Sequence, residues 1–197
     1  GIVAKKLSFL PLSRIMLPED ISKVFASLQQ VGQMEQRREE AKQSGTKLTL
    51  NMLDQILVYV QDFQYILFDS WFSWPEVIKG VKERQRDVIC MLKDMPNIFY
   101  NYQGQTYRLS SLYKAVAKQT EKKTYIASVI VDYYGIPARI IFVHNRNGNK
   151  KREWLALLST DINLAEEEVI RIYGLRWDIE VYFKMCKSFL GLAKEFQ

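Results

Sequence analysis

Asp69 is the first residue whose type and position could do chemistry. It directly follows the short apolar run 65–68, and an apolar run without alternation is typical of a strand buried on both faces. A rigid strand that ends in a carboxylate can aim it into an open crevice, where it could act in catalysis or bind a metal. Because Asp followed by Ser is also typical of a turn or a helix cap, the sequence leaves both interpretations open.

A second group of polar residues lies in a predicted helix over about 164–189, where Asn163 offers an N-cap and Glu166 the spacing of a capping box. At 100° per residue, four polar side chains of this helix fall within about 60° of one another, beside an apolar arc. Such a row could be solvated pairing of helix charges, or an acid that binds a metal beside cations that bind phosphate. Spacing alone favours the first interpretation. The four residues are Tyr173, Arg176, Glu180 and Lys187.

Hydrophobic periodicity predicts the elements that must position these groups. Apolar residues at steps of three and four predict helices, and β-branched alternation after Pro96 predicts strands. The segment 145–149 has the composition of a hairpin turn. The four tryptophans are expected to pack in the core or between these strands, with base stacking as an alternative. Helices are predicted over 19–43, 48–63 and 75–83, and strands over 65–68, 88–92, 124–133, 136–144 and 152–159.

The positive charge of this 197-residue chain is concentrated in one segment. Residues 101–150 contain eight Lys or Arg and two Asp or Glu, which accounts for the whole net charge of +6. The segment also contains six tyrosines, and basic side chains among aromatics suit a polyanion such as nucleic acid. A basic, soluble surface over a tyrosine-packed sheet is the alternative.

Several function classes find no support in the sequence. No apolar run approaches the roughly 18 residues of a membrane helix, and no glycine-rich nucleotide-binding motif occurs. Cys90 and Cys186 are too far apart for a CxxC pair, which excludes a disulfide framework or a zinc site and favours a reducing cytoplasm. His144 is the only histidine, so a catalytic triad has no candidate base beyond it.

The polar row resembles the Y-(2)-R-(3)-E-(6)-K signature of DDE transposases from bacterial insertion sequences, and all four positions match. The segment 65–73 resembles the family's strand with the second catalytic aspartate, and 88–96 is also similar to that group. The resemblance implies an α/β fold, with a ribonuclease-H-like mixed sheet flanked by helices and a β-rich inserted subdomain. It divides the chain into a partial catalytic core (1–96), the insert (97–160) and a core helix (161–197).

The resemblance also implies the site residues. Asp69 and Glu180 are expected to be catalytic and to bind Mg²⁺, with Mn²⁺ as an alternative. Tyr173, Arg176 and Lys187 are expected to contact DNA phosphates, Arg176 as a fork and Lys187 as a point charge. Basic residues of the insert are expected to bind DNA as well, namely Lys122, Lys123, Lys150, Lys151 and Arg152.

The chain departs from the family at the first catalytic aspartate. The candidates are Asp20, Asp54 and Asp62, and none of them ends a predicted strand. We therefore expect that the first strands of the fold are missing and that the chain is an incomplete fragment. Two carboxylates without the third should bind a metal pair poorly, so we expect this chain alone to bind DNA without cleaving it.

The function implied by the resemblance is DNA transposition, with metal-dependent cleavage and joining of strands at insertion-sequence ends. The expected partner is double-stranded DNA and not a membrane, the expected location is the bacterial cytoplasm at the nucleoid, and a homodimer of the full-length protein stays open. One alternative is a non-catalytic, DNA-binding remnant of a transposase. Another is a structural or interaction protein in which the polar row is only a solvated helix face.

Overall fold

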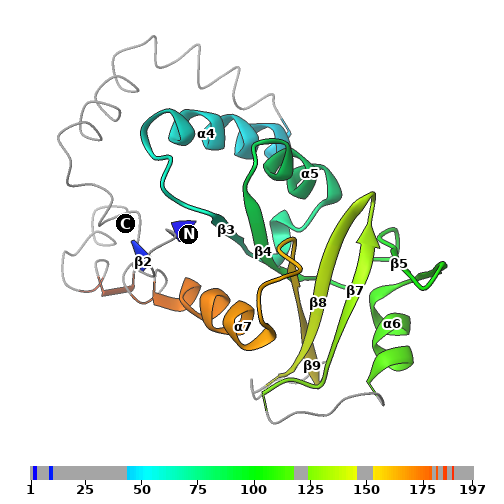
Figure 1. The fold of residues 1–197 in the computed structure, drawn as a ribbon. Helices are drawn as coiled ribbons and strands as arrows, with labels where there is room; N and C mark the ends of the chain where they lie inside the picture. The colour runs from blue at the N-terminus through cyan, green and yellow to red at the C-terminus, as the bar shows by residue number, and fades with distance from the viewer. Residues whose placement is uncertain are drawn as a thin grey trace, which may run out of the picture.

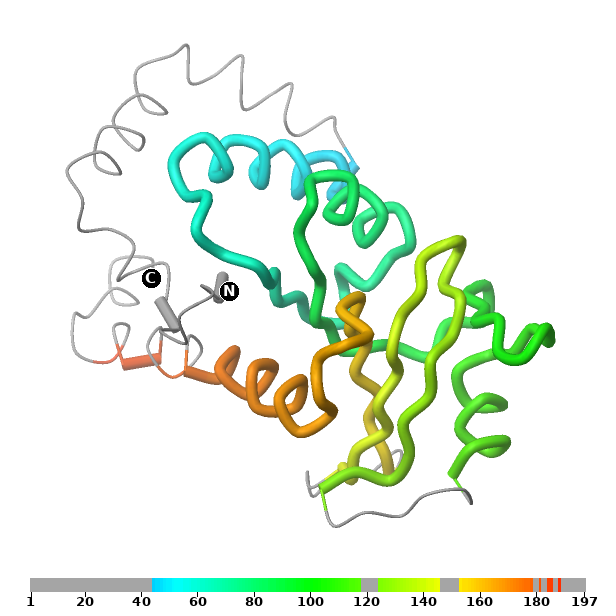
Figure 2. Tube along the Cα trace, viewed as in Figure 1, coloured from blue at the N-terminus to red at the C-terminus, as the bar shows by residue number. Residues whose placement is uncertain are grey.

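The computed structural model describes residues 2–3, 9–10, 44–117, 124–145, 153–178, 181, 184–185 and 188 of the chain. Nine strands form one sheet in this part of the chain (Figures 1 and 2). The strands are β1 (Ile2–Val3), β2 (Phe9–Leu10), β3 (Tyr65–Phe68), β4 (Asp87–Leu92), β5 (Tyr100–Tyr102), β6 (Gln105–Tyr107), β7 (Ala127–Tyr133), β8 (Ile136–His144) and β9 (Trp154–Ser159). The helices are α4 (Gly45–Tyr59), the short 3₁₀ helix η1 (Ser70–Phe72), α5 (Pro75–Glu83), α6 (Leu109–Val116) and α7 (Glu166–Gly174).

The strand order is β2-β1-β3-β4-β9-β8-β7-β5-β6. Strands β3 and β4 are parallel, and every other neighbouring pair is antiparallel. Because β9 pairs with β4, the strands of the segment 97–160 continue the sheet that β3 and β4 begin. The mixed α/β architecture is compatible with the expected fold class, while the division into three domains stays a prediction.

Helices cover both faces of the sheet, so its central strands are buried on both sides. On one face, Ile66 of β3 and Val88 of β4 pack in a cluster with residues of α4, α5 and α6. On the other face, Leu67 and Ile89 pack against α7, and Figure 1 shows α7 across the sheet from α4 and α5. The apolar runs without alternation predicted this two-sided burial, and the prediction is confirmed.

Two of the predicted helices illustrate how local signals start and stop a helix. Helix α5 has the predicted bounds, with Pro75 in its first turn, where a missing N–H costs nothing. Helix α4 begins at the Ser44 cap, whose side chain accepts a hydrogen bond from the N–H of Lys47. It ends at Tyr59, short of the predicted residue 63, because Phe63 instead packs in the core within the loop that leads to β3.

The predicted meander is present, with the bounds of β8 as expected. Tyr134 and Gly135, both at positive φ, form its first turn, and such turns match the twist of the paired strands. The turn segment 146–150 lies outside the described residues, as does the predicted helix 19–43. Helix α6 was not predicted, although its buried Leu109, Leu112 and Val116 have helical spacing.

Helix α7 differs from the predicted helix at its start and near residue 175. It begins after Ala165, whose side chain makes no cap bond, and Asn163 instead donates its N–H to Asp161 in the preceding turn. The capping-box prediction was therefore wrong, since Glu166 pairs with Arg139 of β8. Leu175 forms a turn and residues 176–178 are helical again. Among the helices described, none combines the length and hydropathy that a bilayer-spanning segment needs.

Candidate active site

Asp69 occupies the junction between the end of β3 and the start of η1. Its carboxylate accepts a hydrogen bond from the N–H of Ser70 at 2.6 Å, and its carbonyl accepts one from the N–H of Phe72 at 3.0 Å. Asp69 therefore follows a buried strand, as predicted, and also caps a helix, while its role in catalysis or metal binding stays a prediction. The cap fixes the direction of a half-buried carboxylate at the carboxyl end of β3, next to the parallel strand β4.

Tyr173 lies in the last turn of α7 and is buried, with 7% of its surface exposed. It packs in the same cluster as Leu67 of β3 and Ile89 of β4. The prediction that Tyr173 belongs to an exposed polar row was wrong. Tyr173 is four residues after Val169, so it shares the face by which α7 packs on the sheet.

The pKa of the Tyr173 hydroxyl depends on its burial and on the charges of Arg176 and Asp69. Burial raises its pKa to about 12, the Arg176 guanidinium acts in the opposite direction, and the Asp69 carboxylate raises it further. The Tyr173 hydroxyl is therefore neutral near pH 7, and its ring lies against the Arg176 guanidinium. This hydroxyl donates to no acceptor among the described residues, and a buried donor normally has a partner.

Arg176 follows α7 directly and is partly exposed. Its guanidinium carbon lies 5.5 Å from the ring centre of Tyr173 and 5.5 Å from that of Trp177. Rings on which a guanidinium rests orient its fork and attract its charge. The end of α7 thus brings together a buried hydroxyl and a guanidinium, and Tyr173 packs in one cluster with Leu67 of β3, the strand that Asp69 follows.

The other predicted site residues lie outside the described part of the chain. They are Glu180, Lys187, Lys122, Lys123, Lys150, Lys151 and Arg152. The expectation that Asp69 and Glu180 face one another in a shared crevice therefore stays a prediction.

A family model described as "Transposase DDE domain" matches residues 33–195. The chain belongs to the transposase DDE domain family. The match spans Asp69, the whole meander and the Tyr173–Lys187 segment, so the residues of the candidate site all lie within the family's domain. No curated protein and no solved structure matches the chain.

Enzymes of the DDE transposase family generally use divalent metals. Carboxylate oxygens are the ligands that Mg²⁺ prefers, so Asp69 has the right donor chemistry. Within the described ranges, no three His, Cys, Asp or Glu side chains lie close enough to hold a metal ion together. Asp69 is therefore not part of a three-residue metal site within the described ranges, and Glu180, the second expected ligand, lies outside them.

The candidates for the first catalytic aspartate do not follow strands. Asp54, on α4, forms a two-pronged ion pair with Arg84 at 2.5 and 2.6 Å, and the hydrogen bond from Arg84 lowers its pKa. Asp62 is exposed in the loop before β3 and lines a cavity of about 270 Å³ with Arg86. Asp20 lies outside the described residues. The expectation that neither Asp54 nor Asp62 ends a strand is confirmed.

Trp71 and Lys93 were missed as neighbours of the site. Trp71 lies two residues after Asp69 and is 72% exposed, so the prediction that it packs in the core was wrong. The Lys93 ammonium nitrogen lies 4.9 Å from its ring centre, and Lys93 lines a cavity of about 300 Å³ with Ser70 and the buried Trp154. Trp74 and Trp177 are exposed too. The available sequence signal was a tryptophan two residues after Asp69 and a lysine directly after the second buried strand.

Proposed function

We propose that this transposase DDE domain cleaves and joins DNA strands at the ends of an insertion sequence, with Asp69 and Glu180 as two of its catalytic carboxylates. This proposal goes beyond the expectation that the chain alone binds DNA without cleaving it, which rested on the unassigned first aspartate and stays a prediction. The observation that carries the proposal is that buried Tyr173, on which Arg176 rests, packs in one cluster with Leu67 of β3, the strand that Asp69 follows. A family match that spans both segments supports it. The finer assignments, a ribonuclease-H-like core and the subgroup with the Y-(2)-R-(3)-E-(6)-K signature, belong to the same proposal.

Each residue has a role that its chemistry permits. Asp69 and Glu180 would hold Mg²⁺ or Mn²⁺, and the bound metal would supply activation of the attacking oxygen and stabilisation of the leaving one. Arg176 would bind two oxygens of one phosphate, since its fork is oriented by the rings of Tyr173 and Trp177. Tyr173 stays protonated at neutral pH, so its hydroxyl would donate a hydrogen bond to a phosphate oxygen.

The basic side chains of the segment 97–160 would extend the DNA contact beyond the site. Each Lys or Arg that neutralises a phosphate displaces condensed counterions, so affinity should fall with salt by a log–log slope of roughly −0.9 per contact. Lys93 would add a cation close to Asp69, and the exposed Trp71 would offer a ring face to a base. With DNA as substrate, the protein would act at the bacterial nucleoid, and pairing of two copies would bring two transposon ends together.

A nicking assay tests the catalytic proposal. The substrate is a supercoiled plasmid that carries the genomic DNA flanking the gene on both sides, incubated with the chain in Mg²⁺ and in Mn²⁺. Asp69→Asn and Glu180→Gln should each abolish nicking and leave DNA binding intact. Glu167→Gln, an exposed position in the first turn of α7, removes the same charge and should nick as the wild type does.

The alternatives predict other results. Salt-dependent DNA binding without nicking under either metal would favour the non-catalytic, DNA-binding remnant. Absence of salt-dependent binding would favour a structural or interaction protein. Nicking that survives both Asp69→Asn and Glu180→Gln would overturn the assignment of the two carboxylates.

A further inference from the structure

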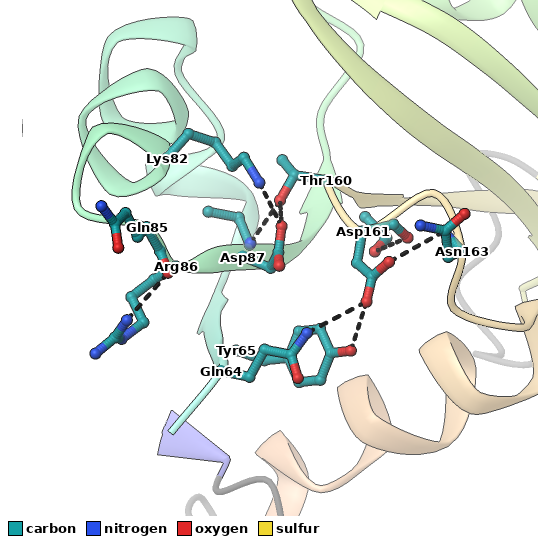
Figure 3. Close-up of polar contacts among 11 residues, drawn as sticks. Gln64, Tyr65, Lys82, Gln85, Arg86, Asp87, Thr160, Asp161 and Asn163 are labelled. Carbon is teal, nitrogen blue, oxygen red and sulfur yellow. Dashed lines mark hydrogen bonds and ion pairs between the residues drawn. The ribbon is translucent and has the colours of Figure 1, made fainter. Parts of the chain in front are cut away.

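The turn between β9 and α7 is bonded to the strands beneath it at several successive residues (Figure 3). Thr160 continues the pairing of β9 with β4, because its N–H donates to the carbonyl of Val88 at 3.1 Å. Its hydroxyl accepts a bond from the N–H of Val88 at 2.9 Å and donates to Asp87 at 2.8 Å. Asp87 also forms an ion pair with Lys82 of α5 at 2.7 Å.

Asp161 connects this turn to β3. Its carboxylate accepts a hydrogen bond from the hydroxyl of Tyr65 at 2.7 Å and a longer one from the side-chain amide of Gln64 at 3.5 Å (Figure 3). The second carboxylate oxygen accepts the N–H of Asn163 at 3.0 Å and so closes the turn. Tyr65 is the buried first residue of β3, and its ring packs in the cluster beneath α7.

Arg139 of β8 stabilises the next step of the turn. One guanidinium nitrogen forms an ion pair with Glu166, the first residue of α7, and another donates to the carbonyl of Ile162 at 2.6 Å. The Arg139 and Glu166 side chains are only 18% and 21% exposed, so water screens this pair less than a surface pair. The start of α7 is therefore tied to β3, β4 and β8 before the helix runs on.

The Tyr65–Asp161 hydrogen bond lies at the opposite end of β3 from the candidate active site. Tyr65 begins β3 and Asp69 follows its last residue, so about 13 Å of strand separates the two at roughly 3.3 Å per residue. Helix α7 packs on β4 and β9 and rises about 10 Å from Glu166 to Tyr173. The chain leaves β9, turns and continues into α7 (Figure 2), so the Tyr65–Asp161 bond joins the start of β3 to the turn that leads into α7.

We propose that Asp161, through its hydrogen bond from Tyr65, is a positioning residue that sets where α7 lies along β3 and so places Tyr173 and Arg176 beside Asp69. The catalytic meaning of this placement rests on the proposed function. Asp161 itself lies at the far end of β3 and touches no group that would react. A displacement of about 1 Å in a catalytic arrangement can lower a rate by about 10²-fold, so a distant bond can control the chemistry.

Tyr65→Phe is the sharpest test, because it removes one hydroxyl and keeps the buried ring. We expect its single-turnover nicking rate at saturating plasmid to fall by about 10- to 100-fold, with DNA affinity unchanged. Asp161→Ala, which also loses the bonds from Gln64 and Asn163, should slow nicking at least as much. The double variant should be no slower than Asp161→Ala, because Asp161→Ala already removes the bond to Tyr65. The control is Tyr107→Phe, which loses a 2.6 Å bond to Gln105 at the sheet's far edge and should nick normally.

A second measurement needs no activity. In the chain without metal or DNA, Tyr65→Phe should speed amide hydrogen exchange across residues 166–174 at least tenfold and leave the exchange of 136–144 unchanged. Unchanged exchange in 166–174 would overturn the positioning role, even if the wild type does not nick and the proposed function fails. Urea unfolding measures the fraction of each variant that is folded. If the nicking rate falls only in proportion to that fraction, the bond contributes to stability alone, and this result would also overturn the positioning role of Asp161.

Discussion

Arg176 stacks on Tyr173, with its guanidinium carbon 5.5 Å from the ring centre, at the point where α7 ends. The Tyr173 ring is buried against the sheet and so held in place. Its contact with the ring restricts the rotamers of the Arg176 side chain. Trp177 supplies a second ring at the same distance. Because the two rings restrict the Arg176 side chain in advance, less conformational entropy should be lost when it binds a phosphate.

Arg176→Gln should weaken DNA binding and reduce the slope of log affinity against log salt by about 1, because one phosphate contact is lost. Arg171→Gln is the matched control on the same helix. Arg171 is exposed and pairs with Glu168 at 2.6 Å, so its loss should change affinity little. Fluorescence anisotropy with a labelled duplex at several salt concentrations measures both. Equal losses for the two variants would show that the cation at position 176 has no special contact.

Tyr173→Phe should leave the free energy of unfolding unchanged or raise it by up to about 1 kcal/mol. The buried hydroxyl donates to no acceptor within the described part of the chain, so its removal relieves a desolvation cost. Tyr133→Phe is the comparison, because the Tyr133 hydroxyl donates to the carbonyl of Ser73 at 2.9 Å and its loss should cost about 1 kcal/mol. Urea denaturation measures both, and a larger loss for Tyr173→Phe would contradict the assignment.

Alkaline pH should destabilise the fold through its buried tyrosines. Burial is the main cause that raises the pKa of Tyr65, Tyr100 and Tyr133, and burial raises that of Tyr173 to about 12. Above pH 10 these hydroxyls ionise in the unfolded chain and stay protonated in the folded one, so the free energy of unfolding falls as pH rises. Tyr100 and Tyr133, the most deeply buried of the four, should each contribute about 1.4 kcal/mol of loss by pH 11, and Tyr65 and Tyr173 should contribute less. Urea midpoints at pH 8 and 11 that coincide would refute this expectation.

Asp54→Asn should cost less than about 1 kcal/mol of stability and leave nicking intact. Its ion pair with Arg84 joins α4 to α5, but the Asp54 side chain is 52% exposed, and exposed pairs contribute little. Thermal unfolding and the plasmid assay measure the two effects. Loss of nicking by a variant that folds normally would instead identify Asp54 as the third catalytic carboxylate.

Local sequence patterns predicted the parts of the fold that depend on which faces are apolar. The runs 65–68 and 88–92 predicted buried strands and the pattern over 75–83 predicted α5, because each signal acts within a few residues. The position of Asp69 after a buried strand followed from the same reasoning.

Tertiary structure decided what depends on strand order and on packing between distant segments. Helix α4 ends before Phe63 because the ring of Phe63 packs in the core. Tyr173 is buried because α7 packs on the sheet by the face that Val169 and Tyr173 share. Helical periodicity predicts neither outcome, because it shows which residues share a helix face but not which part of the protein packs against that face. The bond between Tyr65 and Asp161 joins residues 96 positions apart, and only the placement of β9 beside β4 brings them within 2.7 Å. A hydrogen bond of this kind has no local signature, since its energy depends on a geometry that the whole sheet must first create.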